Sequence, residues 1–143
     1  MSGAIFGALN DKNDPWQERR SKHARLYYRE IKNSNKDSLI DKISKNAKVR
    51  RYIVKNTYEH LFENKYQLDN GQNQFAPDYD MTQSFQRLIT GRDIQKHDII
   101  LLRHESLEKR LMTRYNYKYK EAHKLTSKKY DYAKALRLWK EGL

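Results

Sequence analysis

The most regular helical pattern of the sequence lies in residues 99–112, which read IILLRHESLEKRLM. Its apolar residues are Ile99, Ile100, Leu101 and Leu102 in a run, followed by Leu107, Leu111 and Met112. Residues three, four or seven apart, such as Ile100, Leu107 and Leu111, share one side of an α-helix. We therefore expect a central, deeply buried helix here, capped at its start by Asp93 or Asp98.

Three further helical patterns precede this segment. Asp14 and Pro15 predict the start of a helix that ends near residues 33–35, because Asp caps helices and Pro suits their first position. Asp37 predicts the cap of a short second helix that breaks near residues 46–47. A third helix follows, with Val49, Tyr52, Ile53, Thr57 and Leu61 on its apolar face.

The remaining patterns complete the expected elements. Residues 64–78 are polar and turn-rich, and Asn70-Gly71 within them is typical of a β-hairpin turn. A helix is expected from Tyr79 to the terminator Gly91, and one broken or two consecutive helices are expected over residues 117–139. Asp78 and Asp80 precede Met81 where acids favour a helix N-terminus, so we interpret this pair as a cap.

These patterns predict an all-α protein, a compact bundle of about five to seven helices with at most one small β-hairpin in the 64–78 loop. Residues 1–13 carry no sustained period and are expected to form a flexible N-terminal arm. Residues 14–143 are expected to form a single helical domain, because a chain of 143 residues has enough material for only one stable core.

The composition of the chain is strongly basic. Thirty Lys and Arg against 18 Asp and Glu give a formal charge of +12, which favours a polyanionic partner, nucleic acid first and an acidic protein second. There is no cysteine, so disulfides, thiolate metal sites and cysteine nucleophiles are excluded. We expect synthesis in the cytoplasm, since neither a secretory signal nor a membrane span is visible in the sequence.

Several exposed cations are candidates for phosphate contacts. Two adjacent helices around residue 48 could act as a helix-turn-helix, and a run of Lys interleaved with Tyr near residues 115–130 could hold phosphates and stack bases. The predicted nucleic-acid-binding residues are Arg50, Arg51, Lys55, Arg103, Lys118, Lys120, Lys124 and Lys128.

Histidines and acids near residue 104 are the best candidates for chemistry. His104 and Glu108 share the apolar face of the central helix, and a buried carboxylate requires a cation, a proton or a hydrogen-bond network. His123 on the following helix is the natural residue to meet them. With His60, these imidazoles could transfer protons in metal-free phosphodiester cleavage, oriented by Glu105 or Glu108.

Two alternatives to metal-free catalysis remain open. No cofactor is required by the sequence, but His104, Glu108 and His123 could hold a divalent metal, with Glu105 as the general base. The sequence departs here from the His-Glu-x-x-His motif, because its fifth position is Glu108. Alternatively, the same histidines could be hydrogen-bonded residues of a core without any catalytic role.

An ordered set of short motifs resembles a known family. The motifs are Glu59-His60-Leu61-Phe62, then Phe75-Ala76-Pro77-Asp78-Tyr79-Asp80-Met81, Ser84-Phe85-Gln86-Arg87-Leu88, His97-Asp98-Ile99-Ile100-Leu101-Leu102-Arg103-His104-Glu105, and Glu121-Ala122-His123. Over roughly residues 20–133, the chain resembles a C-terminal module of bacterial polymorphic toxins and phage head-associated (minor head type) proteins. The resemblance implies a toxin domain delivered into a target cell, often a nuclease, with an immunity protein as partner. It also marks the sites at His60, His104, Glu105, Glu108 and His123.

We therefore expect an antibacterial or phage-associated effector domain that acts on nucleic acid by histidine-based phosphodiester cleavage, with His104 and His123 as acid and base. The first alternative is a non-enzymatic basic protein of a phage or mobile element that binds nucleic acid or an acidic host protein. The second is a metal-dependent hydrolase with a His-Glu-His site.

Overall fold

The computed structural model describes residues 15–142, so the predicted N-terminal arm and the predicted cap Asp14 lie outside the described residues. Within that range the chain forms seven α-helices and one two-stranded antiparallel sheet. The elements are α1 (Gln17–Asn33), α2 (Lys36–Ala47), α3 (Arg51–Tyr58), a π-helical turn (Glu59–Glu63), β1 (Tyr66–Leu68), β2 (Gly71–Asn73), α4 (Tyr79–Thr90), α5 (Lys96–Thr113), α6 (Tyr119–Lys129) and α7 (Tyr132–Lys140). The predicted all-α class, with one small hairpin, is confirmed.

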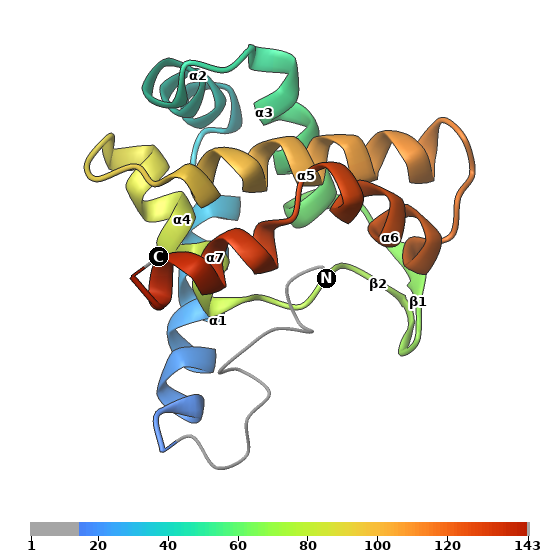
Figure 1. Ribbon diagram of the computed structural model, residues 1–143, viewed down its shortest axis with the longest axis horizontal. Helices are drawn as coiled ribbons and strands as arrows, with labels where there is room; N and C mark the ends of the chain where they lie inside the picture. Colours follow the sequence, from blue (N-terminus) through green and yellow to red (C-terminus); the bar gives the residue numbers. More distant parts are fainter. Residues whose placement is uncertain (1–14, 143) are drawn as a thin grey trace.

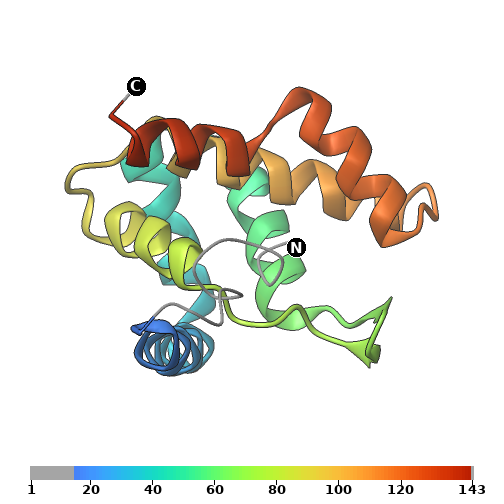
Figure 2. The ribbon, with the colours of Figure 1, turned by 60° about the horizontal axis from the view of Figure 1, so that its bottom comes forward.

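Helix α5 is the centre of the fold. Figure 1 shows it running through the molecule, and α3, α4, α6 and α7 all contact it. Leu101 and Leu102 are fully buried, as the apolar run in the sequence predicted. Helix α1 packs on α4, and α2 packs on α3 and α4; the hairpin projects at one end, beyond the start of α6 (Figure 2). None of the helices in residues 15–142 is both long and apolar enough to cross a membrane.

Aromatic rings form the apolar core beside α5. Phe62 contacts Tyr28 and Phe85 edge to face, with ring centroids 5.0 and 5.3 Å apart. Ile40, Ile43 and other fully buried aliphatic side chains close the same cluster. Edge-to-face pairs add about 1 kcal/mol each to the free energy of burial. The core therefore joins α1, α2 and α4 to the end of α3.

Three local predictions are corrected by the structure. Asn35, not Asp37, caps α2, because its Oδ1 accepts a hydrogen bond from the Ser38 amide at 2.9 Å. Gln95, not Asp93 or Asp98, is the N-cap of α5, although Asp98 accepts from the Gln95 amide at 2.8 Å and completes a capping box. Tyr52, predicted on the apolar face of α3, is 53% exposed.

Asp78 caps α4 as predicted, but it does so from a fully buried position. Its Oδ1 accepts a hydrogen bond from the Met81 amide at 3.0 Å. Its Oδ2 has no hydrogen-bond partner among the described residues. Burial raises the pKa of Asp78 to about 7, with a further contribution from the charge of Asp80.

Gly91 ends α4 in the left-handed conformation, with φ of 75°. The side chain of Asn46, at the end of α2, donates from Nδ2 to the carbonyls of Leu88 and Ile89 at 2.8 and 3.1 Å. A Cβ on Gly91 would lie 3.1 Å from Asn46 Cγ. Two helix ends are therefore joined where only a glycine fits comfortably.

We predict that Gly91→Ala lowers the free energy of unfolding by about 1–2 kcal/mol, because it adds left-handed strain and crowds Asn46. Urea unfolding followed by circular dichroism measures the loss. Gly142→Ala is the matched control, because Gly142 has φ of 76° and its added Cβ would meet nothing within 4 Å. An equal loss in both variants would show that the contact with Asn46 is unimportant.

We also predict that the free energy of unfolding of Asp78→Asn, relative to that of the wild type, increases as the pH rises. The folded-state pKa of Asp78 is about 7, whereas an unfolded Asp titrates near about 4. The stability that Asp78 contributes is therefore fully present below the unfolded pKa and is lost as the pH rises through the folded pKa. Asn keeps a capping oxygen and does not titrate, so the difference in unfolding free energy should increase between about pH 5 and about pH 8. A difference that stays constant over this range would contradict the assignment.

Candidate active site

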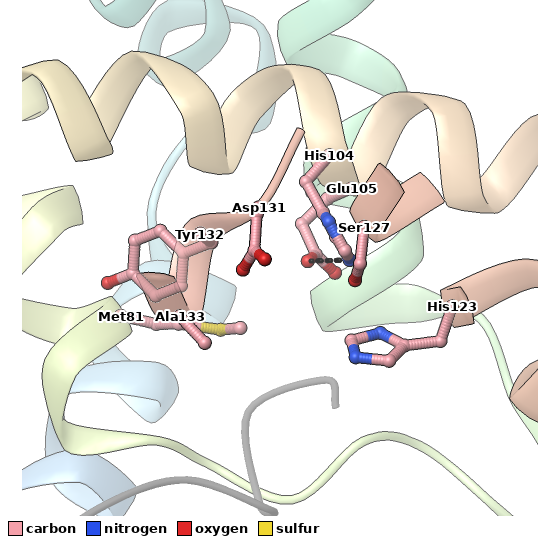
Figure 3. A pocket seen from close by; sticks show the side chains of 8 residues that line it. All are labelled: Met81, His104, Glu105, His123, Ser127, Asp131, Tyr132 and Ala133. Atoms are coloured by element: carbon pink, nitrogen blue, oxygen red, sulfur yellow. Dashed lines mark ion pairs between the residues drawn. The ribbon is translucent and has the colours of Figure 1, made fainter. Parts of the chain in front are cut away.

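Three elements bring the predicted histidines and acids together. The π-helical turn supplies His60, α5 supplies His104, Glu105 and Glu108, and α6 supplies His123. His104 and Glu108 are four residues apart and therefore lie on one face of α5. Figure 3 shows His104 and Glu105 from α5 and His123 from α6 around one hollow. All five predicted catalytic residues thus belong to one cluster, which we call the Glu108 cluster.

The carboxylate of Glu108 is the hub of this cluster. Its Oε1 is 2.8 Å from Nε2 of His60. Its Oε2 is 3.1 Å from Nε2 of His104 and 2.8 Å from Nδ1 of His123. Glu108 is completely buried, so these three imidazoles take the place of water around its charge.

The orientation of His104 is set by the chain between α6 and α7. Nδ1 of His104 donates to the carbonyl of Tyr130 at 2.7 Å, since a carbonyl can only accept. In the neutral ring, Nε2 would therefore carry a lone pair directed at a carboxylate. Burial lowers the pKa of His104, but the hydrogen bond to Glu108 and the charge of Glu105 outweigh it and raise the pKa to about 9. A cation, either a proton or a metal ion, must lie between Nε2 and Glu108.

His60 is held differently, through a tyrosine of the hairpin. Its Nδ1 lies 2.7 Å from the hydroxyl of Tyr66, and that hydroxyl accepts from Nδ2 of Asn64 at 2.9 Å. Burial raises the pKa of Tyr66 to about 12, so the phenol keeps its proton. The Tyr66 hydroxyl can donate to Nδ1 of His60, while Nε2 of His60 donates to Glu108. These contacts hold the His60 ring against Glu108.

Glu105 and Glu108 have opposite proton affinities. Burial and the neighbouring charge of Glu108 raise the pKa of Glu105. Burial acts in the same direction on Glu108, but the hydrogen bonds from His104, His123 and His60 outweigh it and lower the pKa of Glu108 well below its usual value. Glu108 therefore carries the negative charge, and Glu105 favours its neutral form.

A cavity of about 20 Å³ adjoins the cluster. It is lined by Met81, His104, Glu105, His123, Ser127, Asp131, Tyr132 and Ala133, which Figure 3 labels. This volume is sufficient for one water molecule. His123, whose side chain is 22% exposed, stands at the edge of the cluster, whereas the side chains of His60, Glu105 and Glu108 are at most 1% exposed.

The spacing of the side chains is compatible with a metal ion. One ligand atom each from His104, Glu108 and His123 lies within 4.8 Å of the others, and the same holds for His60, Glu105 and Glu108. Ligands about 2.0–2.2 Å from a common zinc ion are themselves roughly 3.3 Å apart. The hydrogen bond from His104 to Tyr130 also matches the backbone contact that usually orients a metal-binding imidazole.

The predicted nucleic-acid-binding residues are all exposed, and they come from three parts of the chain: residues 50–55, residue 103 on α5 and residues 118–128. Arg51 binds Asp41 and Asp37 at 2.6 and 3.2 Å, so its charge is already compensated. Lys120 lies 3.8 Å from Asp69. Arg103 and Lys55 line grooves elsewhere on α5, away from the cavity.

The sequence did not indicate the outer contacts of the cluster. Tyr66 was predicted only as part of the hairpin, and the Tyr130 carbonyl leaves no signal in a sequence. No family model matches the chain. No curated protein and no solved structure is significantly similar to it.

We predict that Glu108→Gln and Glu105→Gln differ sharply in stability, although both remove a buried carboxyl group of the same size. Glu108→Gln should lower the unfolding free energy by about 3 kcal/mol or more, because it removes the charge that three imidazoles surround. Glu105→Gln resembles the neutral acid and should cost about 1 kcal/mol or less. Urea unfolding at neutral pH in the presence of a chelator measures both. Equal losses would contradict the division of charge between the two acids.

Proposed function

We propose that this chain is a metal-dependent hydrolase that cleaves phosphodiester bonds in nucleic acid. The observation that carries the proposal is the cavity for one water molecule, which is lined by His104, Glu105 and His123 beside the charged Glu108. Catalytic zinc sites commonly have three protein ligands and one open position that water occupies. The formal charge of +12 supports a polyanionic substrate.

His104, Glu108 and His123 are the residues that would hold the cation, because their ligand atoms face one another across at most 4.8 Å. When bound, a divalent ion supplies a Lewis acid that acidifies water and polarises a phosphoryl oxygen. His60 fixes the second oxygen of Glu108, and the Tyr130 carbonyl fixes the tautomer of His104. This arrangement orients the ligands before the substrate arrives.

Glu105 is the general base of the proposal. It lines the water-sized cavity, and burial and the charge of Glu108 raise its pKa. A divalent ion bound beside it would favour its carboxylate form, which is the form that takes a proton from water. Direct proton transfer by His104 is less well supported, because both of its ring nitrogens already have partners at 2.7 and 3.1 Å. The geometry therefore favours the metal-dependent alternative over a metal-free pair of histidines.

We further propose that the activity serves an antibacterial or phage-associated effector, with an acidic immunity protein as a partner. The motifs that resemble polymorphic toxin and phage head-associated modules support this role, and they contain four of the five residues of the Glu108 cluster, all except Glu108. Growth of bacteria that express the chain, compared with bacteria that express Glu105→Gln, tests it: equal growth would argue against an effector.

We predict that the purified chain cleaves RNA or DNA in the presence of a divalent metal and that a chelator abolishes cleavage. Glu105→Gln should reduce the rate by about 10² or more, while its melting temperature falls by no more than a few degrees. His123→Asn should reduce both the bound metal, measured by elemental analysis, and the rate. His23→Asn is the matched control, because His23 lies exposed on α1 and outside the Glu108 cluster.

Two outcomes would contradict the proposal. Undiminished cleavage in the presence of a chelator would indicate a metal-free mechanism in which the histidines alone transfer protons. No cleavage of either nucleic acid with zinc, manganese or magnesium would remove phosphodiester hydrolysis, and the Glu108 cluster would then be a structural element of the core.

A further inference from the structure

A groove follows the face of α5 that points away from the Glu108 cluster. One part, of about 540 Å³, is lined by Tyr52, Lys55, Asn56, Glu59, Lys109, Arg110, Thr113 and Arg114. The adjoining part is lined by Tyr52, Ile53, Arg103, Ser106, Leu107, Arg110, Lys129 and Tyr130. Tyr52 and Arg110 line both parts, so we treat them as one surface, the α3–α5 groove.

Positive charge dominates this groove. Five of its cations are exposed and have no carboxylate within 4 Å among the described residues: Lys55, Arg103, Arg110, Arg114 and Lys129. The one acid in the lining, Glu59, is bound by Lys109 at 2.9 Å and Lys36 at 3.2 Å. The field of the five cations is therefore not cancelled locally, and it favours a polyanion.

Aromatic side chains accompany the cations. Tyr52 is 53% exposed and lies where the two parts of the groove meet. Tyr130 lines the second part, and Nζ of Lys129 lies 5.5 Å from the centre of its ring. A positively charged groove with an exposed aromatic ring is the combination that binds single-stranded nucleic acid, because bases stack on the ring and phosphates contact the cations.

We infer that the α3–α5 groove binds single-stranded nucleic acid, with Arg103, Arg110, Arg114 and Lys55 at the phosphates and Tyr52 stacked on a base. A duplex fits this lining less well, because its bases are already stacked and paired and cannot cover Tyr52. An acidic protein could also cover both the charge and the ring, and the absence of oligonucleotide binding is the result that would favour it.

The groove is distinct from the proposed active site but shares a boundary with it. Tyr130 lines the groove, and its backbone carbonyl accepts from Nδ1 of His104. Nucleic acid held in the groove would therefore lie on the other side of the junction between α6 and α7 from the cavity. The inference concerns binding alone and stands whether or not the Glu108 cluster is catalytic.

The test is fluorescence anisotropy with a labelled single-stranded oligonucleotide of mixed sequence, as RNA and as DNA, and with the corresponding duplex. The full chain is used with a chelator present, so that cleavage does not interfere. We expect Arg110→Ala/Arg114→Ala to weaken single-strand binding at least tenfold and to reduce the slope of log Kd against log salt by about 1.4. The matched control is Arg25→Ala/Arg29→Ala, which removes two exposed arginines of α1 and should change Kd less than twofold.

A second pair of variants tests stacking separately from charge. Tyr52→Ala should weaken single-strand binding about tenfold, whereas Tyr115→Ala, which removes a tyrosine that is 55% exposed outside the groove, should not. Circular dichroism melting verifies that each variant is folded.

Three results would overturn the inference. The first is an equal loss of affinity from the two arginine pairs, which would indicate diffuse charge instead of a site. The second is no binding of any oligonucleotide. The third is equal affinity for the duplex and the single strand, with no effect of Tyr52→Ala. If the chain cleaves nucleic acid but the groove variants bind it normally, the inference about the groove is wrong and the proposed function is unaffected.

Discussion

The buried negative charge of Glu108 constrains the interior of this protein. Glu108 is completely buried and keeps its charge because imidazoles from the π-helical turn, from α5 and from α6 all face its two oxygens. A carboxylate in that position without partners would cost several kcal/mol. The helices that supply these rings must therefore pack in one arrangement, and the polar cluster specifies how α6 and the end of α3 lie against α5.

Glu105 and Glu108, three residues apart, consequently have different protonation preferences. Glu108 is stabilised as a charge by hydrogen bonds, whereas Glu105 is pushed toward its neutral form by burial and by Glu108 itself. Neighbouring titratable groups whose proton affinities are driven apart are a recurring sign of acid–base chemistry. The cavity beside Glu105 is where that difference could act on a bound water.

Local patterns predicted this site better than they predicted its surroundings. The four-residue spacing of His104 and Glu108 was sufficient to put them on one buried face, and a buried Glu108 required partners, which pointed to His123. The contacts of His60 with Tyr66, and of His104 with the Tyr130 carbonyl, depend on packing between distant segments and have no periodic signal. The caps of α2 and α5 were misassigned because Asn35 and Gln95 stand within a few residues of acids that are themselves common N-cap residues. Arg110 and Arg114 were not predicted, because the sequence pattern of a cation on an exposed helix face is the same whether or not a groove lies beside it.

The π-helical turn links the Glu108 cluster to the aromatic core. The amide of Asn64 reaches back five residues to the carbonyl of Glu59, at 2.8 Å, and this wider turn carries both His60 and Phe62. His60 faces the polar cluster, while Phe62 is embedded among the rings of Tyr28, Tyr58 and Phe85. Only two peptide units, and no loop, separate Phe62 from His60. A change in the packing of the aromatic rings would therefore move the His60 imidazole as well.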